Sequence, residues 1–594
     1  MDPARIDAEF PAPSFRGAQE AALDRIRAAF EAGNDVVLVR APTGSGKSLL
    51  ARAIAGCARR PGEAEAHQPV GAYYTTPQVS QLDDVAADSL LDDLSIVRGK
   101  SNYDCILPGE SDTPVDEAPC ARERGFDCPV EHRCPYFSDR AIASNRSIAA
   151  MTLAYFMRTA GSDVFGRRDV VVVDEAHGLA EWAEMYATIE LTPGRVPTAV
   201  WEATPPPAVD GLRDAATYAE RLSAACDRRL TELRAKAELE REEVAERDRL
   251  TELIRELGWF VEDLRDEDSA TTWVVDQPDG AGTAVVIKLM DPARYLHHTV
   301  WDRGARFALL SATILDKDAF CRASGLNPAT VALVDVPHTF PVEHRPLYDT
   351  TRGKMTYEHR DETVPEVARL IVRLMAHHPD EKGLVHAHSY AIAERLRDHL
   401  DRFGVGGRVR SHDSDGRDAA LSAWKRSTAD VFLSVKMEEA LDLEGGLCRW
   451  QVLCKAPYPN TRDSRVARRL EDGQWGWYYR SALRTVIQAC GRVVRAPDDH
   501  GATYLADSSL LDLFERARHD MPDWFADQVD RLSTPDLPAF DPDAALGGDH
   551  TGGARGGDGG GRSERTGSPS GRSGRSGSDA RDPSDHPLSD VWGE

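Results

Sequence analysis

The sequence predicts an α/β protein in which two parallel β-sheets follow one another along a chain of 594 residues. Short apolar runs recur that are typical of strands buried on both faces. Helical stretches separate most of these runs, which favours parallel pairing. The runs fall into two sets, at 1–340 and 341–535, so we expect two domains. The predicted strands are 35–40, 71–75, 169–173, 307–310, 382–387, 431–435 and 449–454.

Two segments interrupt the first set, and a third follows the second. Residues 101–137 are irregular, rich in Pro and acidic residues, and contain four cysteines. Residues 190–270 carry apolar side chains at helical spacing, which predicts an antiparallel helical hairpin. Residues 540–594 are dominated by Gly, Ser, Arg and Asp. Such a composition buries too little apolar surface to fold, so we expect a disordered tail, either without function or with a loose partner-binding role.

Composition excludes several classes of protein. No run of about 18 apolar residues exists, and the N-terminal residues lack the basic region and apolar stretch of a secretion signal. Ten cysteines without regular pairing fit a reducing compartment better than a disulfide framework. We therefore expect a soluble, monomeric, cytoplasmic protein with no membrane contact.

The net charge of −26 is unusual for a nucleic-acid-binding protein, since such proteins carry a basic face. Arg greatly outnumbers Lys, and acidic residues are abundant along the whole chain. We interpret this as adaptation of the entire chain and hypothesise a salt-loving archaeal host. Near 1 M salt the screening length falls to about 3 Å, so stacking and close hydrogen bonds would replace a general basic field. Activity that persists in low salt and disappears in molar KCl would refute the hypothesis.

A glycine-rich segment, Ala41-Pro-Thr-Gly-Ser-Gly-Lys-Ser48, follows a predicted strand and opens a predicted helix. This is the context that a phosphate-binding loop requires. Its backbone N–H groups and the helix N-terminus favour a β-phosphate. Lys47 would reach the β- and γ-phosphates, and the Ser48 hydroxyl would bind Mg²⁺. The nucleotide-binding residues predicted here are Thr43, Gly44, Ser45, Gly46, Lys47 and Ser48.

The sequence Asp174-Glu-Ala-His177 directly follows an apolar run. Asp174 would hold Mg²⁺, and Glu175 would orient and deprotonate the attacking water. We expect His177 to couple the nucleotide state to neighbouring segments. Together with the phosphate-binding loop, this motif predicts a nucleoside triphosphatase.

Three shorter motifs complete the first set. Arg16 and Gln19 precede the first helix, and the Gln19 amide offers a bidentate contact to adenine, which favours ATP. Residues 311–313 (Ser-Ala-Thr) follow a buried strand and would link the phosphate site to nucleic acid. Residues 75–77 (Thr-Thr-Pro) form a polar strand end suited to a phosphate backbone.

The second set contains Gln488, Arg492 and Arg495, which lie at i, i+4 and i+7 and therefore share one helix face. Arginines that face a γ-phosphate from a second domain form an arginine-finger arrangement. Upstream, residues 434–446 end a strand with clustered acids and glycines, among them Asp442.

The ordered series of motifs resembles the XPD/DinG-type iron–sulfur branch of superfamily 2 helicases. The resemblance implies two RecA-like domains, a cluster insertion at 101–137 and an Arch-like insertion at 190–270. It also implies an ATP-dependent DNA helicase that moves 5′ to 3′ on single-stranded or forked DNA, in repair or replication. One departure is Glu439-Ala-Leu-Asp442, where the family usually has Glu-Gly-x-Asp.

Cys105, Cys120, Cys128 and Cys134 lie within the first insertion. Their spacings of 14, 7 and 5 residues differ from the paired hooks of zinc sites, and four thiolates suit a [4Fe–4S] cluster. Spacing alone leaves zinc open, and His132 is a possible rival ligand. The resemblance favours [4Fe–4S], with a structural role as the main interpretation and redox sensing as the alternative.

Two other functions remain open at this level. One is a DNA-stimulated ATPase that senses damage or DNA structure with little unwinding, and the other is an RNA-directed helicase. If the chain binds single strands, bases stack on exposed aromatic rings. The candidates for stacking are Tyr103, Tyr136, Phe137 and Trp301.

Overall fold

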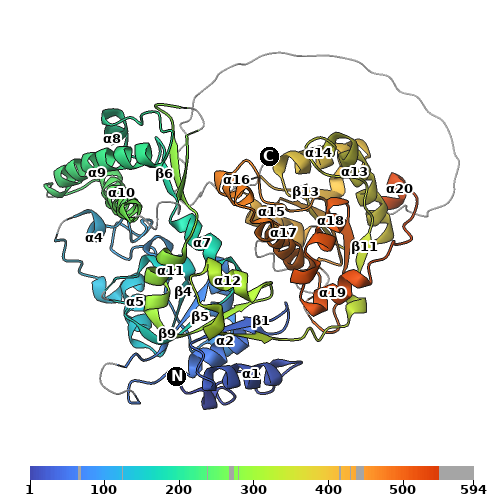
Figure 1. Ribbon diagram of the computed structural model, residues 1–594, viewed down its shortest axis with the longest axis horizontal. Coiled ribbons are helices and arrows are strands. Elements are labelled where there is room, and N and C mark those ends of the chain that lie inside the picture. The colour runs from blue at the N-terminus through green and yellow to red at the C-terminus, as the bar shows by residue number, and fades with distance from the viewer. Residues whose placement is uncertain are drawn as a thin grey trace, which may run out of the picture.

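The computed structural model describes residues 1–63, 68–123, 125–162, 164–236, 238–266, 273–277, 280–413, 416–427, 430–435, 447–494 and 496–546. Two α/β domains lie side by side, and a smaller lobe stands above the first domain in the view of Figure 1. This arrangement confirms the predicted fold class of two parallel-sheet domains with insertions in the first.

The first domain is built on a seven-stranded sheet in the order β10-β1-β9-β5-β2-β4-β3, and all its neighbouring strands are parallel. Its central strands are buried on both faces, as the apolar runs require. The strands are β1 (Val36–Arg40), β2 (Ala72–Thr76), β3 (Ser95–Ile96), β4 (Ile148–Thr152), β5 (Arg168–Val173), β9 (Gly304–Ser311) and β10 (Val331–Asp335).

Helices cover both faces of this sheet and form two separate apolar cores with it. In a parallel sheet the carboxyl ends of the strands share one edge, where ligands bind. The helices are α1 (Gln19–Glu31), α2 (Lys47–Gly56), α3 (Val79–Ala87), α4 (Pro119–Arg122), α5 (Pro135–Asn145), α6 (Leu153–Arg158), α7 (Leu179–Tyr186), α11 (Ala293–Thr299) and α12 (Lys317–Ala323).

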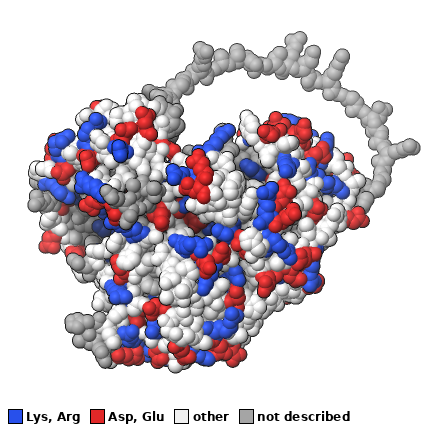
Figure 2. Space-filling view, in the orientation of Figure 1, with Lys and Arg blue, Asp and Glu red and all other residues white. Residues whose placement is uncertain are grey.

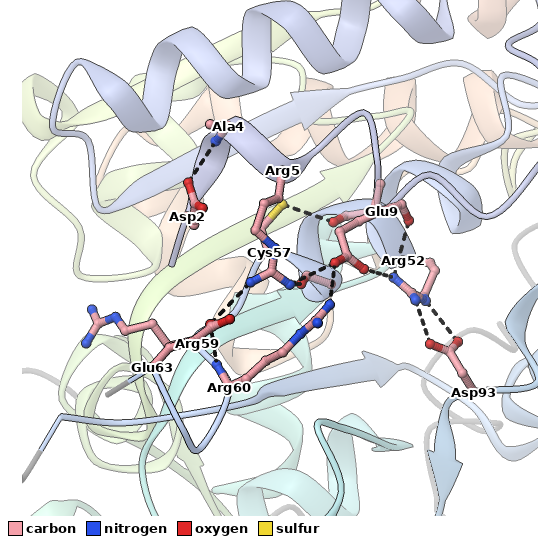
Figure 3. A network of polar contacts seen from close by, with 12 residues as sticks. Asp2, Ala4, Arg5, Glu9, Arg52, Cys57, Arg59, Arg60, Glu63 and Asp93 are labelled. Carbon is pink, nitrogen blue, oxygen red and sulfur yellow. Dashed lines mark hydrogen bonds and ion pairs between the residues drawn. The ribbon is translucent and has the colours of Figure 1, made fainter. Parts of the chain in front are cut away.

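A polar network holds the N-terminal segment against α2 (Figure 3). Glu9 accepts from Arg5 at 2.8 Å and from Arg60 at 2.9 Å, and it pairs with Arg52 at 3.5 Å. Arg52 also pairs with Asp93, which follows α3. Since α2 starts in the glycine-rich segment, these contacts fix the helix that carries Lys47.

The lobe contains residues 189–289. Its long helices α9 (Leu212–Arg234) and α10 (Arg241–Arg265) pack against each other, in line with the expected hairpin, and α8 (Thr198–Ala203) packs on α9. A three-stranded antiparallel sheet, in the order β6-β8-β7, was not expected from the sequence. Its strands are β6 (Ile189–Leu191), β7 (Trp273–Asp276) and β8 (Val285–Leu289).

The second domain has a six-stranded parallel sheet in the order β11-β16-β15-β12-β14-β13. The strands are β11 (Leu347–Asp349), β12 (Gly383–His386), β13 (Val409–Ser411), β14 (Val431–Ser434), β15 (Trp450–Leu453) and β16 (Ala502–Leu505). The helices are α13 (Arg360–His377), α14 (Tyr390–Arg402), α15 (Arg417–Arg426), α16 (Ser464–Glu471), α17 (Trp475–Cys490), α18 (Ser509–Arg516), α19 (Asp523–Asp530) and α20 (Pro542–Ala545).

The predicted tail and three residues of the predicted motifs lie partly or wholly outside the described residues. The segment assigned to a tail begins at 540, but α20 packs on α13 through residues 542–545, and Ala545 is buried. The rest of the predicted tail, from 547, lies outside the described residues, as do Glu439, Asp442 and Arg495. Within the part of the chain that the structure describes, no helix combines the length and apolar character needed to cross a membrane.

Candidate nucleotide site

The glycine-rich segment turns from β1 into α2 at the carboxyl edge of the first sheet. Gly44 and Gly46 have φ of +79° and +80°, a region that favours glycine. At Gly46 the space is also restricted, since a Cβ there would lie 2.3 Å from Gln19 Nε2. The segment therefore needs glycine at 46 both for its turn and for the approach of Gln19.

Gln19 connects this segment to the start of α1. Its Oε1 accepts from the Arg16 backbone N–H at 2.8 Å, and its Nε2 donates to the Ser45 carbonyl at 3.1 Å. The side chain is buried, and its amide retains one N–H and one lone pair. Gln19 thus positions the phosphate-binding segment and still offers two polar groups to a base.

A cavity of about 340 Å³ opens beside this segment. It is lined by residues 12–14 and 16–19, residues 42–46 and residues 336–340, with Ala496 and Pro497 from the second domain. Six of the residues predicted to bind the nucleotide line this cavity, and Lys47 and Ser48 are not among its lining residues. The six are Arg16, Gln19, Thr43, Gly44, Ser45 and Gly46. The cavity has the size and the mixed polarity of a small-molecule site.

His338 lines the cavity and was not predicted as a site residue. Burial lowers its pKa to about 4, assisted by the charge of Arg345, so the imidazole is neutral near pH 7. Its Nδ1 accepts from the Phe340 N–H at 3.2 Å, and its ring contacts Trp524 of the second domain at a centroid distance of 5.3 Å. The residue lies in the connection between the two sheets, outside any sequence motif that would have marked it as a site residue.

Asp174 and Glu175 follow β5 at the same edge. Lys47 Nζ lies 3.3 Å from Glu175 Oε1. Burial opposes ionisation of Glu175, but the charge of Lys47 and a hydrogen bond from His177 outweigh it and lower the Glu175 pKa. Burial and the neighbouring Glu175 charge instead raise the pKa of Asp174. The environment therefore separates the pKa values of the two carboxyl groups, so that Glu175 ionises at a lower pH than Asp174.

The backbone at Glu175 has φ +49°, the left-handed region that non-glycine residues seldom adopt. Such strain is typically stored where surrounding contacts require it. Here it turns the Glu175 side chain toward Lys47 and His177.

Tyr74 on β2 places a hydroxyl group near this carboxyl pair. Burial, together with the charge of Asp174, raises the pKa of Tyr74 far above its usual value, while Ser48 opposes the shift. Among the described residues, its hydroxyl oxygen has no hydrogen-bond partner of normal geometry. Ser48, Tyr74 and Asp174 thus gather oxygen atoms, the ligand type that Mg²⁺ prefers.

His177 connects three predicted motifs. Its Nδ1 lies 2.9 Å from Ser311 Oγ, and its Nε2 accepts from Gln488 Nε2 at 2.7 Å. Gln488 Nε2 also lies 3.4 Å from Thr313 Oγ1. The three motifs predicted separately, at 174–177, 311–313 and 488, therefore meet at one imidazole.

The C-terminal end of α17 also approaches the phosphate-binding segment. A Cβ at Gly491 would lie 2.7 Å from Thr43 Oγ1. Arg492 follows immediately and is partly buried, whereas Arg495 lies outside the described residues. The structure brings Gln488 and Arg492 to the nucleotide edge and leaves the second predicted arginine without a description.

Arg484 is an interface residue that the sequence analysis missed. Its Nη1 donates to Glu181 Oε1 at 2.8 Å and to the His177 carbonyl at 3.2 Å. It precedes Gln488 by four residues on α17, so helical spacing from Gln488 could have identified it.

The interface between the domains continues beyond Arg484 as buried ion pairs. Glu184 on α7 pairs with Arg469 on α16, and the exposed fractions of the two residues are 5% and 7%. Lys288 Nζ lies 2.8 Å from Asp276 and 2.7 Å from Asp463. These contacts join α7 and the lobe's sheet to the second domain.

Residues 75–77 differ from their predicted role. The Thr75 hydroxyl donates to the Val172 carbonyl, and the Thr76 hydroxyl donates to the Gln78 carbonyl. Both side chains are buried. These hydroxyl groups already have partners inside the domain, so a phosphate contact there would have to replace them.

The four cysteines of residues 101–137 lie near one another, although the predicted cluster set stays a prediction. Burial raises the pKa of the Cys120 thiol, and the charges of Cys128, Cys105 and Cys134 raise it further, which places all four sulfurs within electrostatic range. Among the described residues, no three of these thiols lie within 4.8 Å of one another. The thiol donor set fits the [4Fe–4S] expectation.

This cysteine segment is also tied to the lobe. Arg241 at the start of α10 donates to Thr113, and Arg247 donates to the Ala121 carbonyl at 2.9 Å. A small core of Tyr103, Val115, Cys134 and Tyr136 stabilises the segment from within.

The helicase C-terminal domain family matches residues 371–528. The predicted resemblance to XPD/DinG-type helicases is confirmed. A helicase named "Regulator of telomere elongation helicase 1" from Homo sapiens is 34% identical over 121 residues, which are 17% of this chain and 10% of that protein. Its Drosophila sechellia homologue is 33% identical over 105 residues, which are 15% and 11% of the two chains. The chain thus matches only about a tenth of the length of these helicases.

Solved structures show the same fold across most of the chain. The structure titled "XPD_Helicase" has a TM-score of 0.56 at 17% identity and covers 88% of this chain and 100% of that one. The structure of S. tokodaii Xpd4 has a TM-score of 0.51 at 16% identity, with coverages of 84% and 97%. The helicase fold therefore extends over both α/β domains.

Proposed function

We propose that this chain is an ATP-dependent DNA helicase that translocates 5′ to 3′ on single-stranded DNA and unwinds forked duplexes, in repair or replication. The observation that carries the proposal is the contact between His177 and Gln488. It joins the predicted water-activating motif of one domain directly to the predicted γ-phosphate-sensing helix of the other. Closure and opening of the cleft would then follow the state of the nucleotide.

The proposed roles follow from the geometry of the cavity. Residues 43–48 would bind the phosphates, and Ser48 and Asp174 would hold Mg²⁺. When bound, Mg²⁺ would neutralise part of the negative charge of the phosphates. Gln19 and Arg16 would bind the base, and Arg492 would approach the γ-phosphate. Arg495 and Asp442 stay proposed from the sequence alone.

Lys47 and Glu175 suggest how ATP prepares the catalytic base. In the structure Lys47 pairs with Glu175, which favours the ionised carboxylate. A γ-phosphate would draw Lys47 away from this pair, and the Glu175 pKa would then rise. A carboxylate with a higher pKa accepts a proton from water more readily, so the base becomes stronger when its substrate is in place.

Cys105, Cys120, Cys128 and Cys134 would hold a [4Fe–4S] cluster, which supplies a cross-link for residues 101–137 when bound. The chain's own contacts from Arg241 and Arg247 would pass this rigidity to the lobe. Absence of absorbance near 400 nm, with stoichiometric zinc instead, would refute the iron assignment.

We also propose that the protein is a monomer in the cytoplasm. Sedimentation as a dimer would contradict the proposed monomer, and recovery from the membrane fraction would contradict the proposed location.

A strand-displacement assay tests the main proposal. Duplexes with a 5′ tail or a 3′ tail, in DNA and in RNA, are compared with ATP and Mg²⁺. We expect unwinding of the 5′-tailed DNA alone. ATP hydrolysis stimulated by DNA without unwinding would favour the sensor, and unwinding of RNA would favour the RNA helicase.

Two variants separate the steps of that assay. Lys47→Ala should abolish hydrolysis and unwinding, since the phosphates lose their main cation. Glu175→Gln keeps the shape of the side chain but loses its basicity, so hydrolysis should fall about 10³-fold while ATP still binds. Hydrolysis that survives either change would refute the assigned site.

A further inference from the structure

Four aromatic rings gather at the N-terminal end of α17, far from its contacts with His177. They are Tyr458, Trp475, Tyr478 and Tyr479, and we call them the aromatic platform. Tyr458 and Tyr478 stack with a centroid distance of 5.2 Å and an interplanar angle of 9°. Trp475 contacts Tyr478 and Tyr479 at 6.1 and 6.3 Å. The rings form one continuous cluster rather than scattered side chains.

Trp475 is the open side of the platform. It is 49% exposed, and the tyrosines beside it are half-buried. Large aromatic side chains are normally buried in a core, and a solvent-facing cluster of them marks a binding surface. Two of the four rings predicted from the sequence to stack on bases differ in this respect, whereas the other two, Phe137 and Trp301, are half-buried. Tyr103 and Tyr136 are 9% and 5% exposed and belong to a small core.

The platform lies at the ligand edge of the second sheet. Tyr458 follows the carboxyl end of β15 by a few residues, and ligands of parallel sheets bind at this edge. The same helix that carries the rings reaches the nucleotide site at its other end, where Gln488 meets His177. A 16-residue helix spans about 24 Å, so one rigid element joins the two places.

The charges around the platform are balanced. Arg516 donates to the Tyr479 hydroxyl at 2.8 Å and lies over its ring at 5.4 Å, whereas the exposed Arg468 pairs with Asp472 at 3.1 Å. On the face shown in Figure 2, basic and acidic side chains are interspersed rather than gathered into one basic field. A ligand of the platform would therefore be held mainly by ring contacts.

We propose that the aromatic platform stacks bases of single-stranded DNA, with Trp475 as the principal ring. Every base presents a π-face, so this contact tolerates any sequence, as a translocating enzyme requires. The inference rests on the proposed function and names the surface that holds the strand on the second domain. It also assigns α17 as the element through which strand and nucleotide would affect each other.

Equilibrium binding of a fluorescein-labelled oligothymidine of about 12 nucleotides tests the proposal, measured by anisotropy at several salt concentrations without nucleotide. Trp475→Ala should weaken binding about tenfold at every salt concentration, because stacking is lost but no phosphate contact is. The dependence of log affinity on log salt should keep its slope. Trp475→Phe should stay within about twofold of the wild type, since it keeps a ring.

Tyr357→Ala is the matched control. Tyr357 is 75% exposed in the same domain, and Arg360 lies 4.5 Å from its ring, but it stands outside the platform. Its loss should leave binding unchanged. Tyr478→Leu is a second platform variant, which replaces Trp475→Ala if thermal melting shows that the latter does not fold.

Each outcome has one meaning. Unchanged binding of Trp475→Ala, or an equal loss in Tyr357→Ala, overturns the platform while unwinding by the wild type still supports the helicase. A loss with a shallower salt slope assigns the effect to charge and overturns stacking. A wild type that binds no single strand and hydrolyses no ATP overturns the proposed function and the platform together.

Discussion

The two ends of the interface between the α/β domains are held by different kinds of contact. At the nucleotide end, His177, Ser311 and Gln488 meet through hydrogen bonds without a fixed charge pair. At the lobe end, Glu184 pairs with Arg469, and Lys288 pairs with Asp463, with little exposure to solvent. Neutral hydrogen bonds exchange with water at small net cost, whereas separating buried ions costs several kcal/mol each.

This difference indicates which end moves. A cleft that opens and closes with each ATP needs contacts that break cheaply, and the nucleotide end supplies them. The lobe end resists separation and would act as the hinge. Arg484 lies between the two, with one contact to the His177 carbonyl and one to Glu181.

The largest expected effect comes from breaking the lobe end. Glu184→Gln leaves the buried guanidinium of Arg469 without its counter-charge, which should lower the free energy of unfolding by about 3 kcal/mol. Burial raises the Glu184 pKa against the opposing arginines, which shows that the charge is held at some cost. Chemical denaturation measures the change.

The control for this variant removes both charges. Glu184→Leu combined with Arg469→Leu should recover most of the lost stability, since Arg469 leaves with its partner and Arg465, which lies 3.8 Å from Glu184, keeps Asp463 at 3.9 Å. A double variant no more stable than Glu184→Gln would show that the pair itself, rather than the stranded charge, holds the hinge.

A smaller effect is expected at His338, where the connection between the sheets contacts Trp524. Its folded pKa of about 4 lies below the ordinary 6.5, so the unfolded chain binds more protons between these values. Stability should therefore fall as pH drops from 7 toward 4.5, by up to about 2 kcal/mol for this residue. His338→Phe should lose that part of the pH dependence, measured as the difference between the two melting profiles. Parallel profiles would contradict the assigned burial.

The smallest effect should follow from Arg484→Ala, midway along the interface. The Arg484 and Glu181 side chains are 21% and 35% exposed, so solvent partly screens the pair and the domains should keep their stability within about 1 kcal/mol. Hydrolysis should fall about tenfold, because the His177 carbonyl loses its donor and the imidazole its orientation. Steady-state kinetics with Arg480→Ala as the comparison measures this. An equal loss in both variants would mean that the whole helix face, and not the contact to His177, matters.

The sequence predicted those features that are encoded within a short, continuous stretch of residues. Apolar runs identified the central strands. The segments at 41–48 and 174–177 predicted a nucleotide site because each motif is contiguous, and the structure places both at the same edge of the first sheet. Strand β13 was not predicted because Arg410 and Ser411 are exposed at a sheet edge, so the strand has no apolar run. Strand β4 was not predicted because its alanines are equally compatible with a helix.

Contacts between distant segments could not be predicted in this way. Glu184 and Arg469 are 285 residues apart, and either alone is an ordinary charged residue on a helix. The aromatic platform was missed for a related reason: a sequence shows how many rings are present but not which of them face solvent. Only the fold shows that Tyr136 is buried in a core whereas Trp475 is exposed to solvent.

The lobe enters and leaves the first domain at neighbouring points, because Ile189 of β6 pairs with Ile287 of β8. A segment whose two ends meet can be lengthened, shortened or removed without displacing the strands on either side. The strands of the first sheet therefore do not depend on the length of the segment, although Lys288, Arg241 and Arg247 tie it to other parts of the molecule. A replacement that kept these three contacts could be joined to the first domain across a gap that a short turn would close.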